Sequence, residues 1–202
     1  MKRNIGEQNR RHTSVPFVNP EVAQIMQGLE AELGDPLLTQ SLYFGPTALT
    51  QIRRIIDQGG SIVTDTTLAA NDIDETLLGG HGARVLCFID DPQVVQVAEQ
   101  RRVTRAEVAT DFGLQVPGPK LMVVGSAPAA IQRILQRRRS DPMSDICVLA
   151  APVGFAGVVQ IKERLIENDL CCIVVRGKKG GVPVTVSILN AILRWIHDAK
   201  LS

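Results

Sequence analysis

The sequence has no long hydrophobic run and lacks the segments that mark membrane or secreted proteins. Its apolar stretches fall short of the roughly 18 consecutive residues of a membrane span, and its polar N-terminus has no apolar core of signal-peptide length. No Ser/Gly-rich or charge-block linker and no internal repeat divides the 202 residues. We therefore expect one soluble, cytoplasmic domain over residues 20–202, after a flexible arm at residues 1–19 without a packable face.

A large net charge and metal-binding cysteine spacing are also missing. The formal net charge is +1, which argues against a nucleic-acid partner, because duplex binding needs a strongly basic face with several phosphate contacts. The arginines at residues 137–139 are better explained as cations that face a helix dipole. No C-x-x-C pair occurs among Cys87, Cys147, Cys171 and Cys172. We interpret them as buried free thiols in a reducing compartment and predict no metal site.

The fingerprints of several enzyme classes are absent as well. No G-x-G-x-x-G follows the first predicted strand, and no G-x-x-x-x-G-K-[ST] occurs, which disfavours a Rossmann-like enzyme that uses a nucleotide. A hydrolase elbow of the form G-x-S-x-G is missing too. The three histidines, His12, His81 and His197, are far apart in the chain, and we interpret each as a surface residue rather than a catalyst.

Helical and strand patterns alternate from Pro20 onwards. Asn19 and Pro20, followed by apolar residues at helical spacing, predict a capped amphipathic helix. Strands are predicted from near-continuous apolar runs at residues 61–64, 83–89, 120–124, 146–150 and 171–175. Strands that are buried on both faces have this composition. We therefore expect a single α/β domain with a mostly parallel five-stranded sheet and helices on both faces.

The most unusual segments are the turns that follow four of these strands. They carry glycine, proline or small hydroxyl residues, at residues 64–67, 125–128, 152–157 and 176–181. Glycine lets the backbone approach a ligand, and a helix start offers unpaired N–H groups that suit carboxylates or phosphates. Any one such turn is often a plain connector, but Arg176, Lys178 and Lys179 add cations to the last of them. Because ligands bind outside the carboxyl ends of parallel strands, we expect a small organic anion there.

Several motifs follow one another in order along residues 44–193. They are G-G-S-I-V-T-D at 59–65, V-T-R at 103–105, G-S-A-P-A-A at 125–130, P-V-G-F-A-G at 152–157 with K-E at 162–163, V-R-G-K-K-G-G at 175–181, and L-N-A at 189–191. In this order and spacing they resemble the precorrin-8X methylmutase (precorrin isomerase) family of cobalamin biosynthesis.

The resemblance implies an isomerase that moves one methyl group from C-11 to C-12 of a corrinoid ring, a [1,5]-sigmatropic shift. It also implies a homodimer with the macrocycle at the subunit interface, and no separate cofactor. A macrocycle with many carboxylate arms suits cationic, N–H-rich turns around an apolar floor. The rearrangement needs a proton donor near a ring nitrogen more than it needs a nucleophile.

The resemblance also implies which residues bind the substrate. They lie in or beside the motifs above: Asp65, Thr66, Thr104, Arg105, Gly125, Ser126, Ala127, Pro152, Val153, Gly154, Phe155, Arg176, Gly177, Lys178, Gly180 and Gly181.

One position departs from the family in a way that concerns catalysis. The family's proton donor is a histidine, and ungapped alignment puts Ala31 there, with Glu30 and Glu32 beside it. Arg105, which matches the family's arginine, is then the best candidate for a catalytic role, although a guanidinium is a poor proton donor. Two hypotheses follow: an isomerase of this family, or a non-catalytic protein of the same fold that holds a corrinoid or other tetrapyrrole.

Overall fold

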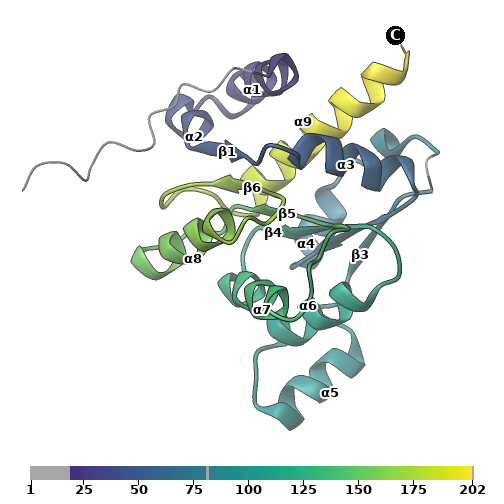
Figure 1. Ribbon diagram of the computed structural model, residues 1–202, viewed down its shortest axis with the longest axis vertical. Coiled ribbons are helices and arrows are strands. Elements are labelled where there is room, and N and C mark those ends of the chain that lie inside the picture. The colour runs from purple at the N-terminus through teal and green to yellow at the C-terminus, as the bar shows by residue number, and fades with distance from the viewer. Residues whose placement is uncertain (1–18, 81, 202) are drawn as a thin grey trace, which may run out of the picture.

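A six-stranded sheet lies between two layers of helices in the computed structural model, which describes residues 19–80 and 82–201 (Figure 1). The strands are β1 (Leu42–Phe44), β2 (Ser61–Thr64), β3 (Arg84–Cys87), β4 (Lys120–Val124), β5 (Ile146–Ala150) and β6 (Cys172–Val175). The helices are α1 (Pro20–Leu33), α2 (Pro36–Gln40), α3 (Ala48–Asp57), α4 (Thr67–Asp72), the 3-10 helix η1 (Glu75–Leu78), α5 (Pro92–Arg101), α6 (Arg105–Gln115), α7 (Pro128–Arg138), α8 (Ala156–Glu167) and α9 (Val182–Leu201).

The strand order is β1-β6-β5-β4-β2-β3, and all neighbours pair in parallel except β1, which runs antiparallel to β6. The mostly parallel α/β sheet is thus confirmed, but the expected number of five strands is wrong. The additional strand, β1, is the sequence Leu-Tyr-Phe, too short to form an apolar run. It is defined by its pairing with β6, in which Leu42 lies opposite Val175, and such long-range pairing leaves no local signal.

Both faces of the sheet are buried, which explains the apolar strand sequences. Leu121 and Leu149 point into a core that α1, α3 and α9 cover. Met122 and Val148 point to the other face, into a core formed with α6, α7 and α8. In Figure 1 these two helix layers lie on opposite sides of the central strands. Because successive side chains alternate between two dry cores, nearly every strand position must be apolar.

The chain order creates a switch point between β2 and β4. From β2 the chain passes through α4 and η1 to β3 at the edge of the sheet, then through α5 and α6 to β4 on the other side of β2. From β4 it steps outward to β5 and β6. The carboxyl ends of β2 to β6 meet at one edge, where open α/β sheets bind ligands.

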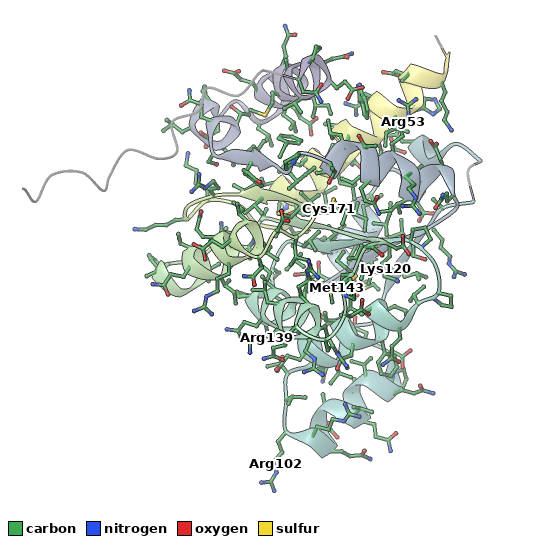
Figure 2. All side chains as sticks on the ribbon, in the orientation of Figure 1. Arg53, Arg102, Lys120, Arg139, Met143 and Cys171 are labelled. Atoms are coloured by element: carbon green, nitrogen blue, oxygen red, sulfur yellow. The ribbon has the colours of Figure 1, made fainter. Side chains whose placement is uncertain are left out.

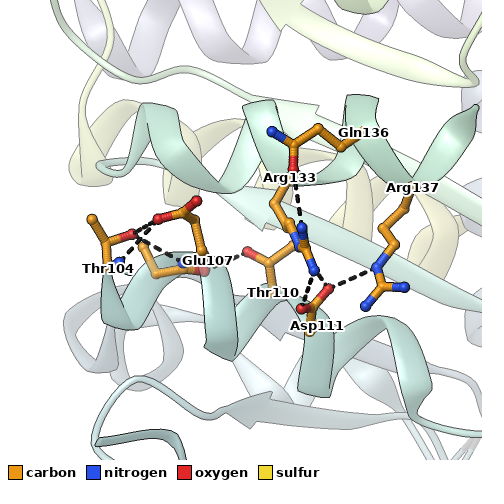
Figure 3. Close-up of polar contacts among 8 residues, drawn as sticks. Thr104, Glu107, Thr110, Asp111, Arg133, Gln136 and Arg137 are labelled. Atoms are coloured by element: carbon orange, nitrogen blue, oxygen red, sulfur yellow. Dashed lines mark hydrogen bonds and ion pairs between the residues drawn. The ribbon is translucent and has the colours of Figure 1, made fainter. Parts of the chain in front are cut away.

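A buried carboxylate joins α6 to α7 on the face of the sheet that these helices cover (Figure 3). Asp111, whose side chain is 8% exposed, accepts hydrogen bonds from Arg133 Nε at 2.8 Å, Arg133 Nη2 at 2.6 Å and Arg137 Nε at 2.8 Å. Burial raises the pKa of Asp111, but the two guanidinium groups outweigh burial and leave it below the ordinary value. Arg137 also lies in the last turn of α7, as the sequence predicts for a cation at a helix end.

The predicted arm at residues 1–19 lies outside the described residues, except for Asn19, which caps α1 as expected. Across residues 19–80 and 82–201, no helix combines the length and the apolar character needed to cross a membrane.

Candidate functional site

The loops that follow β4, β5 and β6 touch one another at the carboxyl edge of the sheet. Gly181 N donates to Ala151 O at 2.7 Å, and Gly154 N donates to Lys178 O at 3.2 Å, so the last two loops are joined by backbone hydrogen bonds. At Gly125, an added Cβ would lie 3.0 Å from Val182 Cα, which places the turn after β4 against the start of α9. The sequence-based expectation that these three segments share one edge is confirmed.

The residues that the sequence singled out follow the strands of the sheet or begin α6, and they form five groups. They are Asp65 and Thr66 after β2; Thr104 and Arg105 at the start of α6; Gly125, Ser126 and Ala127 after β4; Pro152, Val153, Gly154 and Phe155 after β5; and Arg176, Gly177, Lys178, Gly180 and Gly181 after β6.

Gly180 lets the β6–α9 loop pack closely against the β5–α8 loop. Gly180 has φ +145°, and an added Cβ would lie 1.9 Å from Ala151 O. A side chain there would overlap the β5–α8 loop and adopt a backbone conformation that L-residues rarely reach. Gly180 is therefore required by backbone packing, whether or not a ligand is bound.

Asp65 uses its carboxylate inside the protein. Its side chain lies at the end of β2, and the residue is 8% exposed. Gly125 N donates to Oδ1 at 3.1 Å, while Ser126 N and Ala127 N donate to Oδ2, each at 2.7 Å. The N–H groups of the β4–α7 turn, which the sequence suggested for a ligand anion, thus bind a carboxylate of the same chain.

The predicted threonines are helix caps. Thr66 Oγ1 accepts from Ala69 N at 3.1 Å at the start of α4. Thr104 forms a capping box with Glu107 at the start of α6 (Figure 3). Arg105, the first residue of α6, is exposed and forms no ion pair with the acidic residues that the structure describes.

Two of the three cations after β6 are neutralised by carboxylates of the chain. Arg176 Nε lies 3.0 and 3.1 Å from the Glu163 carboxylate oxygens, and Arg176 Nη2 lies 2.7 Å from Glu163 Oε2. Lys179 Nζ lies 2.5 Å from Asp35 Oδ2, and this hydrogen bond is the main reason why the pKa of Asp35 is lowered. Lys178 Nζ has a weaker contact, 5.9 Å from the centroid of the Phe155 ring. Lys178 is thus the cation of this loop that is best placed for a ligand carboxylate.

Exposed apolar side chains lie beside these cations. Phe155 is 81% exposed and Val153 is 59% exposed, both in the β5–α8 loop. A pocket between β2, β4 and α6, lined in part by Asp65 and Ala106, has room for about one water molecule. It is far too small for a macrocycle. This pocket therefore cannot hold a large ligand.

Lys162 belongs to the K-E motif at residues 162–163, but the sequence analysis did not include it among the residues of the site. Its side chain is fully buried in α8, and Nζ donates to Lys179 O at 3.3 Å, which supports the β6–α9 loop from below. Burial lowers the pKa of Lys162 to about 8. The available signal was its position between Ile161 and Leu165 on the apolar face of the helix.

Ala31 and Arg105 lie on opposite sides of the sheet. Ala31 is an exposed residue of α1, which packs against α9, whereas α6 packs against α7 on the other face (Figure 1). They cannot contact one atom of a ligand within a single chain. His197, half-buried in α9, is the one histidine within residues 19–80 and 82–201; His12 and His81 lie outside them.

The fold and the site define a class: a doubly wound α/β protein with glycine-rich, partly cationic loops at the carboxyl edge of its sheet. A family model described as Precorrin-8X methylmutase matches residues 3–195. The chain is 34% identical to the cobalt-precorrin-8 methylmutase of Salmonella typhimurium over 159 residues, which cover 78% of this chain and 74% of that protein. It is 27% identical to the cobalt-precorrin-8 methylmutase of Methanothermobacter thermautotrophicus, over 93% of this chain and 87% of that protein. The chain belongs to the precorrin-8X methylmutase family.

Solved structures share the fold. A precorrin-8X methylmutase related protein superposes with a TM-score of 0.81 at 22% identity, covering 89% of this chain and 94% of that one. Precorrin-8X methylmutase from Thermus thermophilus superposes with a TM-score of 0.78 at 24% identity, covering 90% of this chain and 89% of that one.

Proposed function

We propose that the protein is an isomerase of cobalamin biosynthesis that moves a methyl group from C-11 to C-12 of precorrin-8 or its cobalt form. The observation that carries the proposal is the family match over residues 3–195, since the matching motifs form the loops of one sheet edge. Open α/β sheets bind their ligands at such edges, which supports the location independently.

The proposed substrate site divides into residues that touch the substrate and residues that shape the loops. Lys178 and Arg105 bind carboxylate arms, because both are exposed cations without a carboxylate partner among residues 19–80 and 82–201. Val153 and Phe155 contact the flat ring through their exposed apolar surface. Gly180 and Gly181 hold the loops together.

A second copy of the chain completes the site in this proposal. The pocket at the edge is too small for a macrocycle, and the exposed Phe155 and Val153 form apolar surface of the kind that subunit interfaces cover. The substrate then lies between two subunits of a homodimer. A cytoplasmic location is supported by the cysteines, all four of which are free thiols.

The test is an absorbance assay with precorrin-8 and with cobalt-precorrin-8, because the methyl shift changes the chromophore. We expect turnover of at least one of them. Lys178→Ala should weaken substrate binding by about 1–3 kcal/mol, the loss of a charged hydrogen bond. Arg101→Ala, in the last turn of the outlying α5, removes an exposed cation elsewhere and serves as the matched control. If the purified protein neither binds nor converts either compound, the proposal is refuted.

A second candidate function is corrinoid or tetrapyrrole binding without turnover. It is favoured by Ala31, which occupies the position where the resemblance expects the family's histidine. In that case precorrin-8 binds without a change of chromophore, and Arg105→Ala weakens its binding by about 1–3 kcal/mol. Ala31→His then creates turnover if the aligned register is right. Isomerase activity of the unmodified protein would exclude this candidate.

A further inference from the structure

The Asp65 carboxylate sits at the switch point of the sheet, between the ends of β2 and β4. Both of its oxygens are used: Oδ1 accepts from Gly125 N, and Oδ2 accepts from Ser126 N and Ala127 N. No cationic side chain within residues 19–80 and 82–201 forms an ion pair with it. The carboxylate of a residue that is only 8% exposed needs compensation for lost hydration, and here backbone N–H groups supply it.

The three donors are consecutive and converge on one anion. Such an array of N–H groups is a carboxylate-sized anion site, and the positive end of the α7 dipole strengthens it. Pro128 is the first residue of α7 and has no N–H. Every N–H group of the turn at residues 125–128 therefore already donates to Asp65. A substrate carboxylate could bind these N–H groups only by displacing the Asp65 carboxylate, which has the same charge and lies in a nearly buried position.

The same turn positions the loop that carries Lys178. Gly125 leaves an added Cβ only 3.0 Å from Val182 Cα and 3.1 Å from Thr185 Oγ1, so the turn packs directly against the start of α9. Thr185 Oγ1 in turn donates to Gly181 O at 2.8 Å, and Gly181 N donates to Ala151 O. A shift of the β4–α7 turn is therefore transmitted through α9 to the β5–α8 and β6–α9 loops.

We propose that Asp65 is a positioning residue: its carboxylate is a built-in anion that holds the β4–α7 turn in place, so that substrate carboxylates bind at the β6–α9 loop and not at this turn. The anchoring is a property of the fold. Its effect on turnover rests on the proposed function above.

The direct test is chemical rescue of Asp65→Ala, measured as the Tm. The variant loses the anion but keeps the donors, and its Tm should fall by about 4–10 °C. Sodium formate should restore about half of that loss in a saturable manner and leave the Tm of the wild type unchanged after correction for ionic strength. Formamide, which has nearly the same shape and no charge, and sodium chloride at equal ionic strength are the controls. Equal recovery with formate and formamide, or no recovery, overturns the proposal.

If Asp65→Ala does not fold, Asp65→Asn tests the same point by NMR. It keeps the size and one acceptor oxygen but removes the charge. The amide proton resonances of residues 125, 126 and 127 should all move upfield, as charge-assisted hydrogen bonds are lost. Glu163→Gln, which removes a carboxylate from the other side of the site, should leave these three resonances in place. Unchanged resonances in Asp65→Asn contradict the anchoring.

Kinetics separate the positioning role from substrate binding. Formate should raise kcat of Asp65→Ala without raising KM, because it fills a position that the substrate does not use. If the turn holds a substrate carboxylate, formate competes with the substrate and KM rises instead, which overturns the proposal. If the wild type shows no turnover with either precorrin, the proposed function fails while the Tm and NMR measurements still decide the role of Asp65.

Discussion

The thiols of Cys147 and Cys171 face each other across β5 and β6. The register of these strands pairs Val148 with Cys172, which puts Cys147 opposite Cys171. The hydrogen bond from Cys147 and, to a lesser extent, that from the Thr47 hydroxyl lower the pKa of Cys171 to about 7. Burial raises the pKa of Cys147 well above its ordinary value and that of Cys172 to about 12. One half-buried thiol (Cys171 in Figure 2) is thus distinguished from its neighbours by contacts that are not evident in the sequence.

We expect iodoacetamide to modify Cys171 before Cys147 and Cys172, with a rate that is half-maximal near pH 7, because the thiolate is the nucleophile. Thr47→Val removes one hydrogen bond to the thiolate and should shift the midpoint to higher pH. Peptide mass mapping at intermediate times identifies the site. Initial labelling of Cys172 would contradict the contacts described above.

Lys162 makes stability depend on pH in the alkaline range. Its pKa is about 8 in the folded chain, against an ordinary value of 10.5, so between these pH values the unfolded chain binds a proton that the native state does not. The free energy of unfolding must therefore rise as the pH increases through this window, by up to about 3 kcal/mol. Denaturant unfolding of the wild type and Lys162→Met from pH 7 to 10 isolates this effect, since the variant lacks the titrating amine. Parallel pH profiles of the two proteins would show that Lys162 does not contribute it.

At the scale of elements, the site depends on how loops and helices are joined. The β5–α8 and β6–α9 loops are linked by the hydrogen bonds of Gly154 and Gly181, and Lys162 supports the β6–α9 loop from α8. Helices α6 and α7 are linked by Asp111. These links are specific to single residues, which makes each of them testable by one substitution.

Gly180→Ala should destabilise the protein by several kcal/mol and weaken substrate binding, because its Cβ would lie 1.9 Å from Ala151 O at a φ of +145°. Gly157→Ala is the matched control. It lies in α8, and no atom lies within 4 Å of its added Cβ, so alanine should stabilise the helix by about 0.5–1 kcal/mol. Thermal unfolding of both variants checks the pair. Similar Tm changes of the same sign would refute the packing argument.

Asp111→Asn should lower stability at neutral pH by about 1–3 kcal/mol, discounted for the partial exposure of Arg133 and Arg137. The pKa of Asp111 is lowered in the folded chain. Its contribution is therefore present above the unfolded pKa and is lost as the pH falls through the folded pKa. The Tm difference between wild type and variant should narrow from pH 7 towards pH 3. A difference that is constant with pH would mean that charge is not its cause.

At the scale of the whole molecule, the features of the open sheet edge bear on the proposed homodimer. The pocket there has room for about one water molecule, and the loop after β5 exposes large apolar side chains. A doubly wound sheet offers shallow strand-end turns, so a macrocycle held by one chain would keep much of its surface in water. A second subunit across this edge would cover both the exposed apolar side chains and the surface of the macrocycle that one chain leaves in water.

Light scattering at micromolar concentration should give twice the mass of one chain. Val153→Asp, at a residue that is 59% exposed in the β5–α8 loop, should shift the mass towards one chain and abolish turnover, because it places a charge in the proposed interface. Val103→Asp, at a residue that is 40% exposed between α5 and α6, should leave the mass unchanged. Figure 2 shows the adjacent Arg102 at the tip of the molecule, far from the β5–α8 loop. A monomeric wild type, with and without ligand, would rule out the homodimer.

The sequence by itself determined the fold class, the strands that are buried on both faces and the edge at which the unusual turns meet. Each of these follows from local composition and from the rule that parallel strands end at one edge. The helix cap at Asn19 was equally local and was predicted correctly. The motifs also led to the family, because their order and spacing are properties of the chain.

Only the tertiary structure decided what the polar groups of the site contact. The sequence placed Asp65 and the turn after β4 near each other, but it could not show that the carboxylate accepts from N–H groups 60 to 62 residues away. The sequence also could not show that Arg176 pairs with Glu163, that β1 pairs with β6 or that Lys162 is buried. The physical reason is that periodicity and turn chemistry act between neighbours in the chain, whereas the partner of a buried charge is set by how the strands are ordered in the sheet.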